Sequence, residues 1–442
     1  MFIQKLFRAY YPPFHYVFKS SVAALAAPFF VAIFLLATPS VSLAQGIDTV
    51  SLGLQDADRL FLRSNLLLLA GQFNLQVADA QAIQAKLYPN PVFTADFNLY
   101  DPENKKLLHT GQSGQKAFAI QQIILLGGKR KSLIELARQN RELATYELED
   151  LLRNLRFQLH TSLYTIHQQQ AVLRRYRTQL DLLDTIINNY EVQGRLGNIP
   201  LKEVVRLKAA RLQFTTSRSD AYKSSIEEMG RLRLLLRTEA YVLPLIDETA
   251  LEAVAKGGQL QSWLQMATTN RPDLKAAEVQ TRLANANFIY QKQLAIPDMT
   301  VNSSYDQRGG AFKNQVNAGL SIDLPVWNRN RGGIAQARVQ TQSAQNYRDQ
   351  ALAQVRTEVL TANDNLRLCI QEYRNAQRFY NPDFESVYKG VSDNFRKRNI
   401  SLTEFVDFIE SYTQAMVGIE SAKTQLGIAG ERINFTTTAP IF

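Results

Sequence analysis

The sequence predicts a mostly helical protein that also contributes four strands to a membrane β-barrel shared between copies. Two observations lead to this prediction. After its first 44 residues the chain repeats itself once, and each repeat carries two amphipathic strand-like segments and two long helical segments. Strands of about ten residues suit a bilayer, but the smallest membrane barrels need about eight strands, and lipid tolerates no open sheet edge. The chain must therefore oligomerise.

The composition is that of a folded protein without a catalytic or cofactor site. The 442 residues include 50 Lys and Arg against 40 Asp and Glu, and the mean hydropathy of −0.21 excludes a polytopic helical membrane protein. A single cysteine, Cys369, excludes disulfide frameworks and cysteine-based zinc sites. We expect His160 and His167, which share one predicted helix, to make surface or interhelical hydrogen bonds rather than to bind a metal. No nucleophile–base pair or GxSxG motif occurs, so the sequence predicts no enzyme, cofactor, metal site or nucleic-acid partner.

Residues 1–44 have the pattern of a cleaved secretory signal peptide. Three basic residues precede an apolar run over residues 22–37, and small side chains at Ser42 and Ala44 mark a cleavage point. No cysteine follows the apolar run, so a lipid anchor is not predicted. An inner-membrane anchor helix is the alternative interpretation.

The remaining 442 − 44 = 398 residues divide into two similar halves. Residues 195–205 and 396–406 share Arg, Asn, Ile, Leu, Glu and Val at an offset of 396 − 195 = 201 residues, and other landmarks keep nearly the same offset. The period is too long for a solenoid repeat, so the fold should have two-fold pseudo-symmetry. The predicted organisation is a first repeat at 45–240, a linker or equatorial region at 241–262 and a second repeat at 263–442.

Each repeat has the same predicted order of elements. One helix precedes two strands, and two further helices follow them. Helices are expected over residues 53–88, 130–196 and 199–240, and again over 262–294, 331–380 and 401–434. Strands are expected over 91–100, 114–126, 297–306 and 313–325. Apolar and polar residues alternate in the first, third and fourth segments, whereas 114–126 is less regular but rich in strand-forming residues.

The predicted helices are too long for one compact domain. Some 67 residues at about 1.5 Å each give a rod of roughly 100 Å. An apolar seam from Leu133 through Asn140 to Ile166 has a spacing of (166 − 133)/9 = 3.67 residues, which suits nearly straight helices. Asn381-Pro382 should kink the second long helix. The helices must form a tube or extended bundle; a soluble helical-hairpin protein with small β domains is the alternative.

Three motifs, in this order and combined with the duplication, resemble the TolC family of outer-membrane efflux channels. They are Leu87-Tyr-Pro-Asn-Pro91, Gly127-Gly-Lys-Arg130 and Leu324-Pro-Val-Trp-Asn-Arg-Asn-Arg-Gly-Gly-Ile-Ala335. The third is most similar to the branch that contains the heavy-metal efflux channels. The resemblance implies a homotrimer with 3 × 4 = 12 strands in one barrel, a helical periplasmic tunnel and a mixed belt that includes the region near 241–262 and the chain ends.

The repeated motif resembles the periplasmic tip of the family, where the long helices turn back and a periplasmic adaptor makes contact. The implied tip residues are Gly197, Asn198, Ile199, Pro200 and Leu201, and Arg398, Asn399, Ile400, Ser401 and Leu402. The family usually has glycine where this chain has Arg398, which leaves the second turn's conformation open. Ser401 and Glu404 also fit an ordinary helix cap, and both interpretations can hold.

Glu404 and Asp407 match the positions of acidic residues that narrow the tunnel entrance in the family. Their spacing places them on one helix face, and three copies would form carboxylate rings that favour cations. A solvated polar face is the alternative. Because clustered carboxylates repel, we expect basic residues of the two turns to pair with them. The available partners are Arg195, Lys202, Arg396, Lys397 and Arg398.

These features together predict a passive outer-membrane exit duct of a Gram-negative tripartite efflux system. Its expected partners are further copies of itself, outer-membrane lipid, a periplasmic adaptor and an inner-membrane pump of the RND type. Heavy-metal cations or small toxic compounds are the expected cargo, with drugs, peptides or proteins as alternatives. A periplasmic helical-hairpin adaptor or scaffold is the competing function, but the sequence shows no lipoyl-like β domain between its hairpins.

Overall fold

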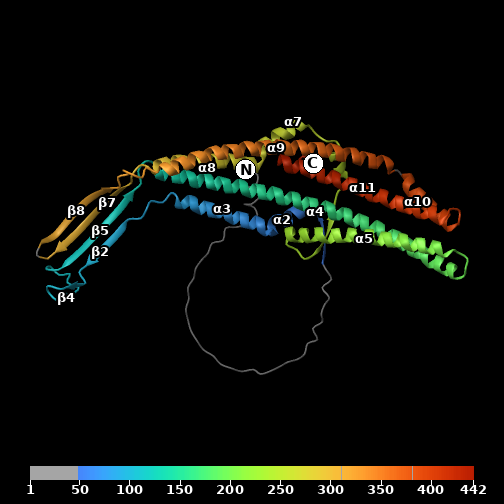
Figure 1. Cartoon of the computed structure of the whole chain (residues 1–442), viewed down its shortest axis with the longest axis horizontal. Helices are drawn as coiled ribbons and strands as arrows, with labels where there is room; N and C mark the ends of the chain where they lie inside the picture. Colours follow the sequence, from blue (N-terminus) through green and yellow to red (C-terminus); the bar gives the residue numbers. More distant parts are fainter. Residues whose placement is uncertain (1–47, 310, 381) are drawn as a thin grey trace, which may run out of the picture. The chain divides into compact units, whose positions relative to one another are not determined.

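The computed structural model describes residues 48–309, 311–380 and 382–442. The predicted signal peptide at 1–44 and Asn381 of the predicted kink lie outside the described residues. Residues 47–442 form one unit, with a four-stranded sheet at one end and two helical turns at the other (Figure 1).

Helices make up most of this unit and follow the predicted order. The first repeat contains α2 (Leu54–Ser64), α3 (Leu66–Gln84), α4 (Lys129–Arg195) and α5 (Leu201–Leu236). The short α6 (Thr249–Val254) follows. The second repeat contains α7 (Leu260–Asn270), α8 (Pro272–Gln293), α9 (Arg331–Phe379), α10 (Pro382–Arg396) and α11 (Leu402–Thr437). None of the described helices combines the length and the apolar character needed to cross a membrane.

Two predicted continuous helices are interrupted, and a predicted kink is a break between helices. In the segment 53–88 the helix is interrupted at Asn65. The Asn65 side chain accepts hydrogen bonds of 3.0 Å from the N–H groups of Leu67 and Leu68 and so caps α3. In the segment 262–294 the break falls at Arg271, before a proline at the first position of α8. The interruption expected near residue 381 separates two helices, α9 and α10, instead of kinking one.

A four-stranded antiparallel sheet joins the two repeats. Its strands are β2 (Val92–Phe97), β5 (Gln115–Ile124), β7 (Met299–Arg308) and β8 (Phe312–Ile322), in the order β2-β5-β7-β8. The central pair, β5 and β7, brings one strand from each repeat together. The edge strands β2 and β8 each keep one side unpaired within the chain. The first predicted strand is shorter than expected, because Tyr100 belongs to the small hairpin of β3 (Tyr100–Asp101) and β4 (Lys106–Leu107).

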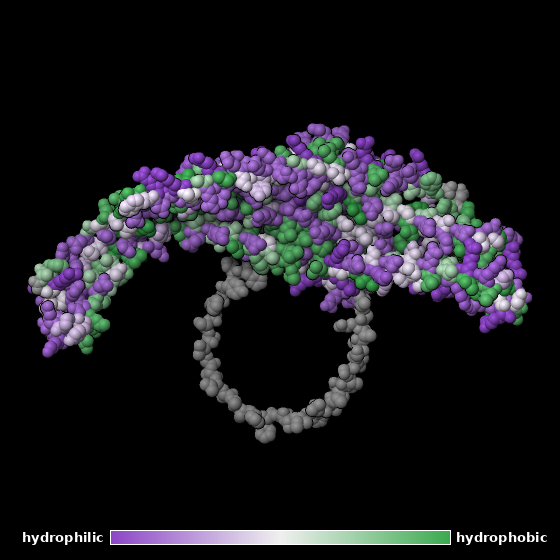
Figure 2. Space-filling model, in the orientation of Figure 1, coloured by the Kyte–Doolittle hydropathy of each residue, from purple (hydrophilic) through white to green (hydrophobic). Residues whose placement is uncertain are grey.

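The register gives this sheet one apolar and one polar face. One row across the four strands contains Ala95, Phe118, Tyr305 and Val316, and the next contains Asp96, Ala117, Asp306 and Gln315. The predicted alternation therefore describes the two faces correctly. Within one chain, however, the apolar face has no cover, since Phe93 is 67% and Val316 70% exposed. Hydrophobic side chains accordingly reach the surface at the strand-bearing end (Figure 2).

The helices form a layered array that continues from the sheet. Next to the sheet, α4 packs between α3 and α8, and α8 packs against α9; farther along, α4 packs against α5 and α11, and α11 packs against α9. The predicted seam of α4 is buried where these layers meet, with Leu159, Leu163 and Ile166 fully buried. Asn140 was assigned to that seam wrongly, because its side chain is exposed.

A mixed region, here called the belt, surrounds the middle of the array. It consists of the parallel pair β1 (Thr49–Gly53) and β6 (Tyr241–Leu245) together with α6 and α7. Buried side chains of α6 and α7 pack with α9 and α11 in one hydrophobic cluster. Arg271, 1% exposed, anchors this region by donating a 2.6 Å hydrogen bond from Nη1 to Glu358 of α9.

Candidate functional site: the two helical turns

The first turn, between α4 and α5, is a glycine-terminated helix end. The N–H of Gly197 donates to the carbonyl of Gly194 (3.1 Å), and the N–H of Asn198 donates to that of Gln193 (2.9 Å). This pair of bonds defines a Schellman motif, which needs a left-handed residue at its centre. Gly197 supplies it with φ +75°. The side chain of Asn198 adds a 2.7 Å hydrogen bond from Nδ2 to Gln193 Oε1.

The second turn, between α10 and α11, makes the same bonds without a glycine. The N–H of Arg398 donates to Phe395 (3.0 Å), the N–H of Asn399 donates to Asn394 (2.9 Å), and Asn399 Nδ2 donates to Asn394 Oδ1 (3.0 Å). Arg398 takes φ +62°. The conformation left open by the sequence is therefore the left-handed one, which costs a non-glycine residue roughly 1–2 kcal/mol. The repeated asparagine has a structural cause, since it completes both turns.

The helices that leave the two turns begin differently. Pro200 precedes α5, whereas Ser401 caps α11 in the predicted capping box. Glu404 Oε2 accepts hydrogen bonds of 2.8 Å from both the N–H and the hydroxyl of Ser401, and the Glu404 N–H donates to the Ser401 hydroxyl (3.2 Å). The hydrogen bond from the Ser401 N–H is the main cause that lowers the pKa of Glu404 below its ordinary value. The helix cap predicted from the sequence is confirmed.

Asp407 pairs with a residue that the sequence argument passed over. Its Oδ1 lies 3.2 Å from Nη2 of Arg206, and Arg206 Nη1 donates to Thr403 Oγ1 (3.0 Å). Because 407 − 201 = 206, this ion pair joins equivalent positions of the two repeats. The offset therefore contained the signal, since it places an arginine in the first repeat where the second has an aspartate.

The partners predicted for the two carboxylates were wrong. Within the described residues, Asp407 pairs with Arg206, and Glu404 bonds to Ser401. Arg396 instead lies 3.6 Å from Asp393 on its own helix. Arg206 lies in α5 one helical turn beyond Lys202, and this position brings its guanidinium within 3.2 Å of Asp407.

Apolar packing, more than charge, holds the two hairpins together. The rings of Phe395 and Phe405 stack with centroids 4.1 Å apart, and Phe405 is fully buried. The cluster also includes Leu180, Leu183, Ile186, Ile187, Leu207, Ala210, Phe214, Leu402, Val406 and Ile409. Exposed pairs such as Arg206–Asp407 contribute at most about 1 kcal/mol. The ion pair therefore adds little to an association that the apolar cluster provides.

The two histidines of α4 differ in what they contact: His160 connects helices, whereas His167 contacts a strand. His160 Nε2 lies 3.1 Å from Asp58 of α2, and His160 Nδ1 lies 3.0 Å from Glu431 of α11. Burial opposes its charge, but the hydrogen bonds to these carboxylates outweigh burial and raise the pKa of His160 to about 9. His167 Nδ1 lies 3.4 Å from the carbonyl oxygen of Pro244 in β6. Among the described residues, no group of three or more His, Cys, Asp or Glu side chains could hold a metal ion.

Comparisons with known proteins agree with this geometry. Residues 263–396 match the outer membrane efflux protein family. The chain is 22% identical over 400 residues to the cobalt-zinc-cadmium resistance protein CzcC of Cupriavidus metallidurans, covering 88% of each chain. It is 26% identical over 324 residues to the nickel-cobalt-cadmium resistance protein NccC of Alcaligenes xylosoxydans xylosoxydans, covering 71% of this chain and 69% of that protein.

Solved structures share the architecture. The structure of CusC superposes with a TM-score of 0.70 at 16% identity over 87% of this chain and 91% of that one. The structure of the Campylobacter jejuni CmeC outer membrane channel superposes with a TM-score of 0.70 at 13% identity, over 88% of this chain and 86% of that one. The predicted resemblance to the TolC family is confirmed. The family match covers α7 to α10 and ends at Arg396, two residues before the left-handed Arg398 of the second turn.

Proposed function

We propose that the protein is the outer-membrane channel of a tripartite efflux system, a passive trimeric duct that docks to a periplasmic adaptor and an inner-membrane pump. The observation that carries the proposal is the four-stranded sheet with an uncovered apolar face, which continues directly into helical hairpins. Such a sheet is unstable alone in lipid, because its edges would leave backbone groups unpaired.

The two edges of the chain support a trimer. Pairing β8 of one copy with β2 of the next is a heterologous contact, which closes into a ring when the rotation fits. Three copies would supply 3 × 4 = 12 strands. The helix before β2 carries a matching apolar stripe, because Leu66, Leu69, Phe73 and Val77 recur at helical spacing and are 39–55% exposed. The neighbouring copy would cover this stripe.

A mass measurement in mild detergent tests the trimer. We expect three copies for the unaltered chain. Changing Phe73 and Val77 to Glu should reduce the trimer, because charge would then lie in a contact between apolar helices. Adding the same charges beside the stripe, at Asn74 and Gln76, should leave three copies. A stable monomer of the unaltered chain with full β content would contradict the proposal.

Aromatic residues at the junction of sheet and helices support a membrane boundary there. Trp327, after β8, is 94% exposed, and Tyr88, before β2, is 72% exposed with the Arg130 guanidinium 4.0 Å from its ring centre. Tryptophan and tyrosine favour the headgroup level of a bilayer. The sheet would then lie in the outer membrane and the helical turns in the periplasm.

Fluorescence tests this boundary, because the only other tryptophan is buried. Trp263 is 3% exposed, so a Trp263→Phe variant leaves Trp327 as the sole reporter. In vesicles that contain lipids brominated near the headgroups, the emission of Trp327 should be quenched. Emission equal to that in unbrominated vesicles would show that this junction does not lie at the membrane surface.

The tip residues are the proposed adaptor contact and entrance. The two Schellman turns, Gly197–Leu201 and Arg398–Leu402, end the hairpins and present side chains to a partner. Of the two proposed gate carboxylates, Asp407 is the stronger candidate for a carboxylate ring, because Glu404 is engaged in the cap of its own helix. Disrupting the exposed Arg206–Asp407 pair would free Asp407 when the tip opens.

Heavy-metal cations are the proposed cargo, on the strength of the names of CzcC and NccC. Deleting the gene should increase sensitivity to cobalt, zinc, cadmium or nickel, and the unaltered chain should restore resistance. Several drugs serve as the comparison. Unchanged metal sensitivity together with increased drug sensitivity would replace metals by drugs as cargo, and no change to any compound would contradict efflux.

A further inference from the structure

A cavity in the belt is lined by cations and hydrogen-bond donors and by no carboxylate. It lies between one face of α9 and the loop that follows α6, and its volume is about 540 Å³. We call it the basic cavity. Its charged and amide lining consists of Lys256, Arg367, Arg374, Arg378, Asn363, Gln371 and Asn375.

The four cations of the basic cavity lack partners of opposite charge. Within the part of the chain whose side chains the structure describes, none of them takes part in an ion pair, and Arg374 alone makes a hydrogen bond, from Nη2 to the carbonyl of Ala255 (2.9 Å). All four side chains are exposed, so water and salt screen their mutual repulsion, but an anion bound among them would be attracted by each. The arrangement therefore suits an anionic ligand.

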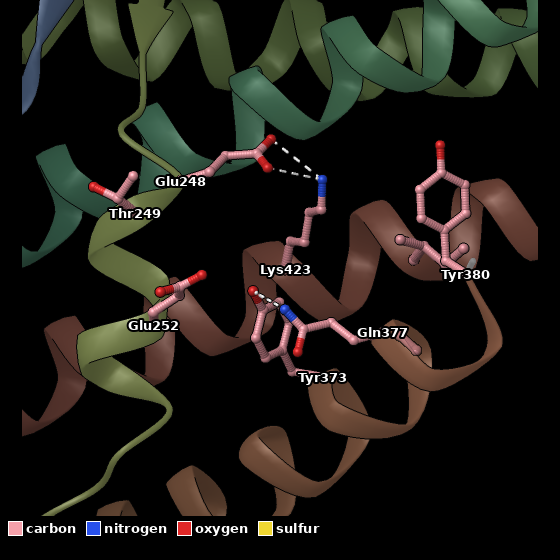
Figure 3. A pocket seen from close by; sticks show the side chains of 9 residues that line it. Glu248, Thr249, Glu252, Tyr373, Gln377, Tyr380 and Lys423 are labelled. Carbon is pink, nitrogen blue, oxygen red and sulfur yellow. Dashed lines mark hydrogen bonds and ion pairs between the residues drawn. The ribbon is translucent and has the colours of Figure 1, made fainter. Parts of the chain in front are cut away.

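A second cavity of the belt contains a lysine that is neutralised by carboxylates of the chain itself. There Lys423 Nζ lies 3.0 Å from Glu248, and Gln377 Nε2 donates to the hydroxyl of Tyr373 (Figure 3). Outside the cavity lining, Glu420 lies 3.8 Å from the same Nζ. These carboxylates satisfy the lysine internally. The basic cavity, on another face of the same helix, has no such carboxylate among its lining residues.

The floor of the basic cavity offers one more donor. Trp263 lines it and is 3% exposed, and no hydrogen bond to its indole N–H occurs among the described residues. Gly258 keeps the edge of this ring open, since a Cβ at that position would come within 2.5 Å of the indole. The indole N–H can donate to an acceptor inside the cavity, and a carboxylate oxygen would provide one.

The spacing of the arginines favours an extended ligand over a single ion. Arg367, Arg374 and Arg378 stand at i, i+7 and i+11 and so share one face of α9. Eleven residues at about 1.5 Å each spread them over roughly 16 Å. About five residues of an extended peptide, at roughly 3.3 Å each, cover this distance.

We propose that the basic cavity binds an acidic segment of the periplasmic adaptor, as a second docking site in the belt, remote from the tip. The inference rests on the proposed function, because it assigns a further contact to the same partner. Carboxylates of the segment would pair with the arginines of α9, and one of them would accept from the indole of Trp263.

Peptide binding to the purified full-length channel tests the chemistry. In a Trp327→Phe background, Trp263 is the sole tryptophan and reports on the cavity floor. A penta-glutamate peptide should change its emission and bind with an affinity that falls with salt, whereas penta-glutamine should do neither. Replacing Arg374 and Arg378 with Gln should weaken penta-glutamate binding by about tenfold or more.

A matched control removes two charges elsewhere. Arg177 and Arg218 are exposed on α4 and α5, and neither takes part in an ion pair among the described residues. Changing both to Gln should alter penta-glutamate binding less than about twofold. Equal weakening in the two double variants, or an unchanged Trp263 emission, would overturn the basic cavity as the binding site.

Photo-crosslinking in cells identifies the occupant. A crosslinking residue at Gln371 samples the basic cavity, and one at Asn198 samples the tip. Capture of the adaptor at both positions, with loss at Gln371 alone in the Arg374→Gln, Arg378→Gln variant, is the expected result. Capture at the tip alone would overturn the belt site but leave the proposed function standing. Capture at neither would refute the proposed function, and cell-wall polymer captured at Gln371 would overturn the protein segment as occupant.

Discussion

Arg398 occupies a left-handed position that glycine fills in the equivalent turn, so replacing it with Gly should stabilise the second turn. Relieving the φ +62° conformation gains roughly 1–2 kcal/mol. Against this gain, ordering a glycine costs about 0.5–1 kcal/mol more in conformational entropy, because glycine has more backbone freedom when the turn is open. The difference is a net stabilisation of about 0.5–1 kcal/mol. No ion pair is lost among the described residues, because Arg398 forms none there.

The reverse substitution provides the control. Gly197 has φ +75°, and a Cβ built there meets nothing within 4 Å. Gly197→Arg therefore adds backbone strain without a clash, and it should destabilise the first turn by a similar amount, about 0.5–1 kcal/mol. The two variants change opposite turns in opposite directions, so a general effect on the channel cannot mimic both.

Native-state hydrogen exchange measures both changes locally. The informative amides are those of Asn198 and Asn399, which close the two Schellman turns. A shift of 0.5–1 kcal/mol in local opening changes the exchange rate about two- to fivefold. The Asn399 amide should exchange more slowly in Arg398→Gly, and the Asn198 amide faster in Gly197→Arg. Faster exchange of Asn399 in Arg398→Gly would refute the strain argument.

Three further predictions concern the helices. Phe405→Ala should destabilise the tip by about 3–5 kcal/mol, because the ring is fully buried against Phe395, whereas Ala at the exposed Phe379 should change unfolding little; chemical denaturation compares them. A double-mutant cycle on Arg206 and Asp407 should give a coupling below about 1 kcal/mol that vanishes in high salt; a larger, salt-insensitive coupling would contradict an exposed pair. The pKa of His160 is raised to about 9, so the stability that charged His160 contributes should be complete below about pH 6.5 and lost as the pH rises to about 9. Thermal unfolding across this range measures the loss, and a His160→Gln variant that keeps the same pH dependence would contradict His160 as its cause.

The sequence could predict those elements whose cause is local. The absence of proline between residues 130 and 196 allowed one long helix, and α4 runs over 67 residues. The alternation in the strands placed their two faces correctly, because side chains in a strand alternate. The left-handed Arg398 could not be derived from residue type, since the turn is closed by backbone groups that every residue except proline possesses.

The belt was harder to predict because its contacts are distant in sequence. Strand β1 pairs in parallel with β6, which lies almost 200 residues farther along the chain, and both strands are only five residues long. Pro244 lies inside β6 and argues against a strand when the sequence is read alone. The basic cavity escaped notice for a similar reason. Lys256 and the arginines of α9 are separated by more than a hundred residues and meet only in the fold.

The Arg206–Asp407 pair follows from how a duplicated hairpin can pack against its own copy. Where two equivalent helices lie side by side, equivalent positions also lie close together. An unchanged duplication would therefore place like charges opposite one another, which is unfavourable even at an exposed site. The first repeat has Arg206 and the second Asp407, so divergence to opposite signs turns that repulsion into an attraction. Glu203 and Glu404 kept the same sign, and Glu404 is engaged in its own helix cap instead. The two acidic residues of the second repeat thus have separate contacts: Glu404 caps the start of α11, and Asp407 pairs with Arg206 of the neighbouring hairpin.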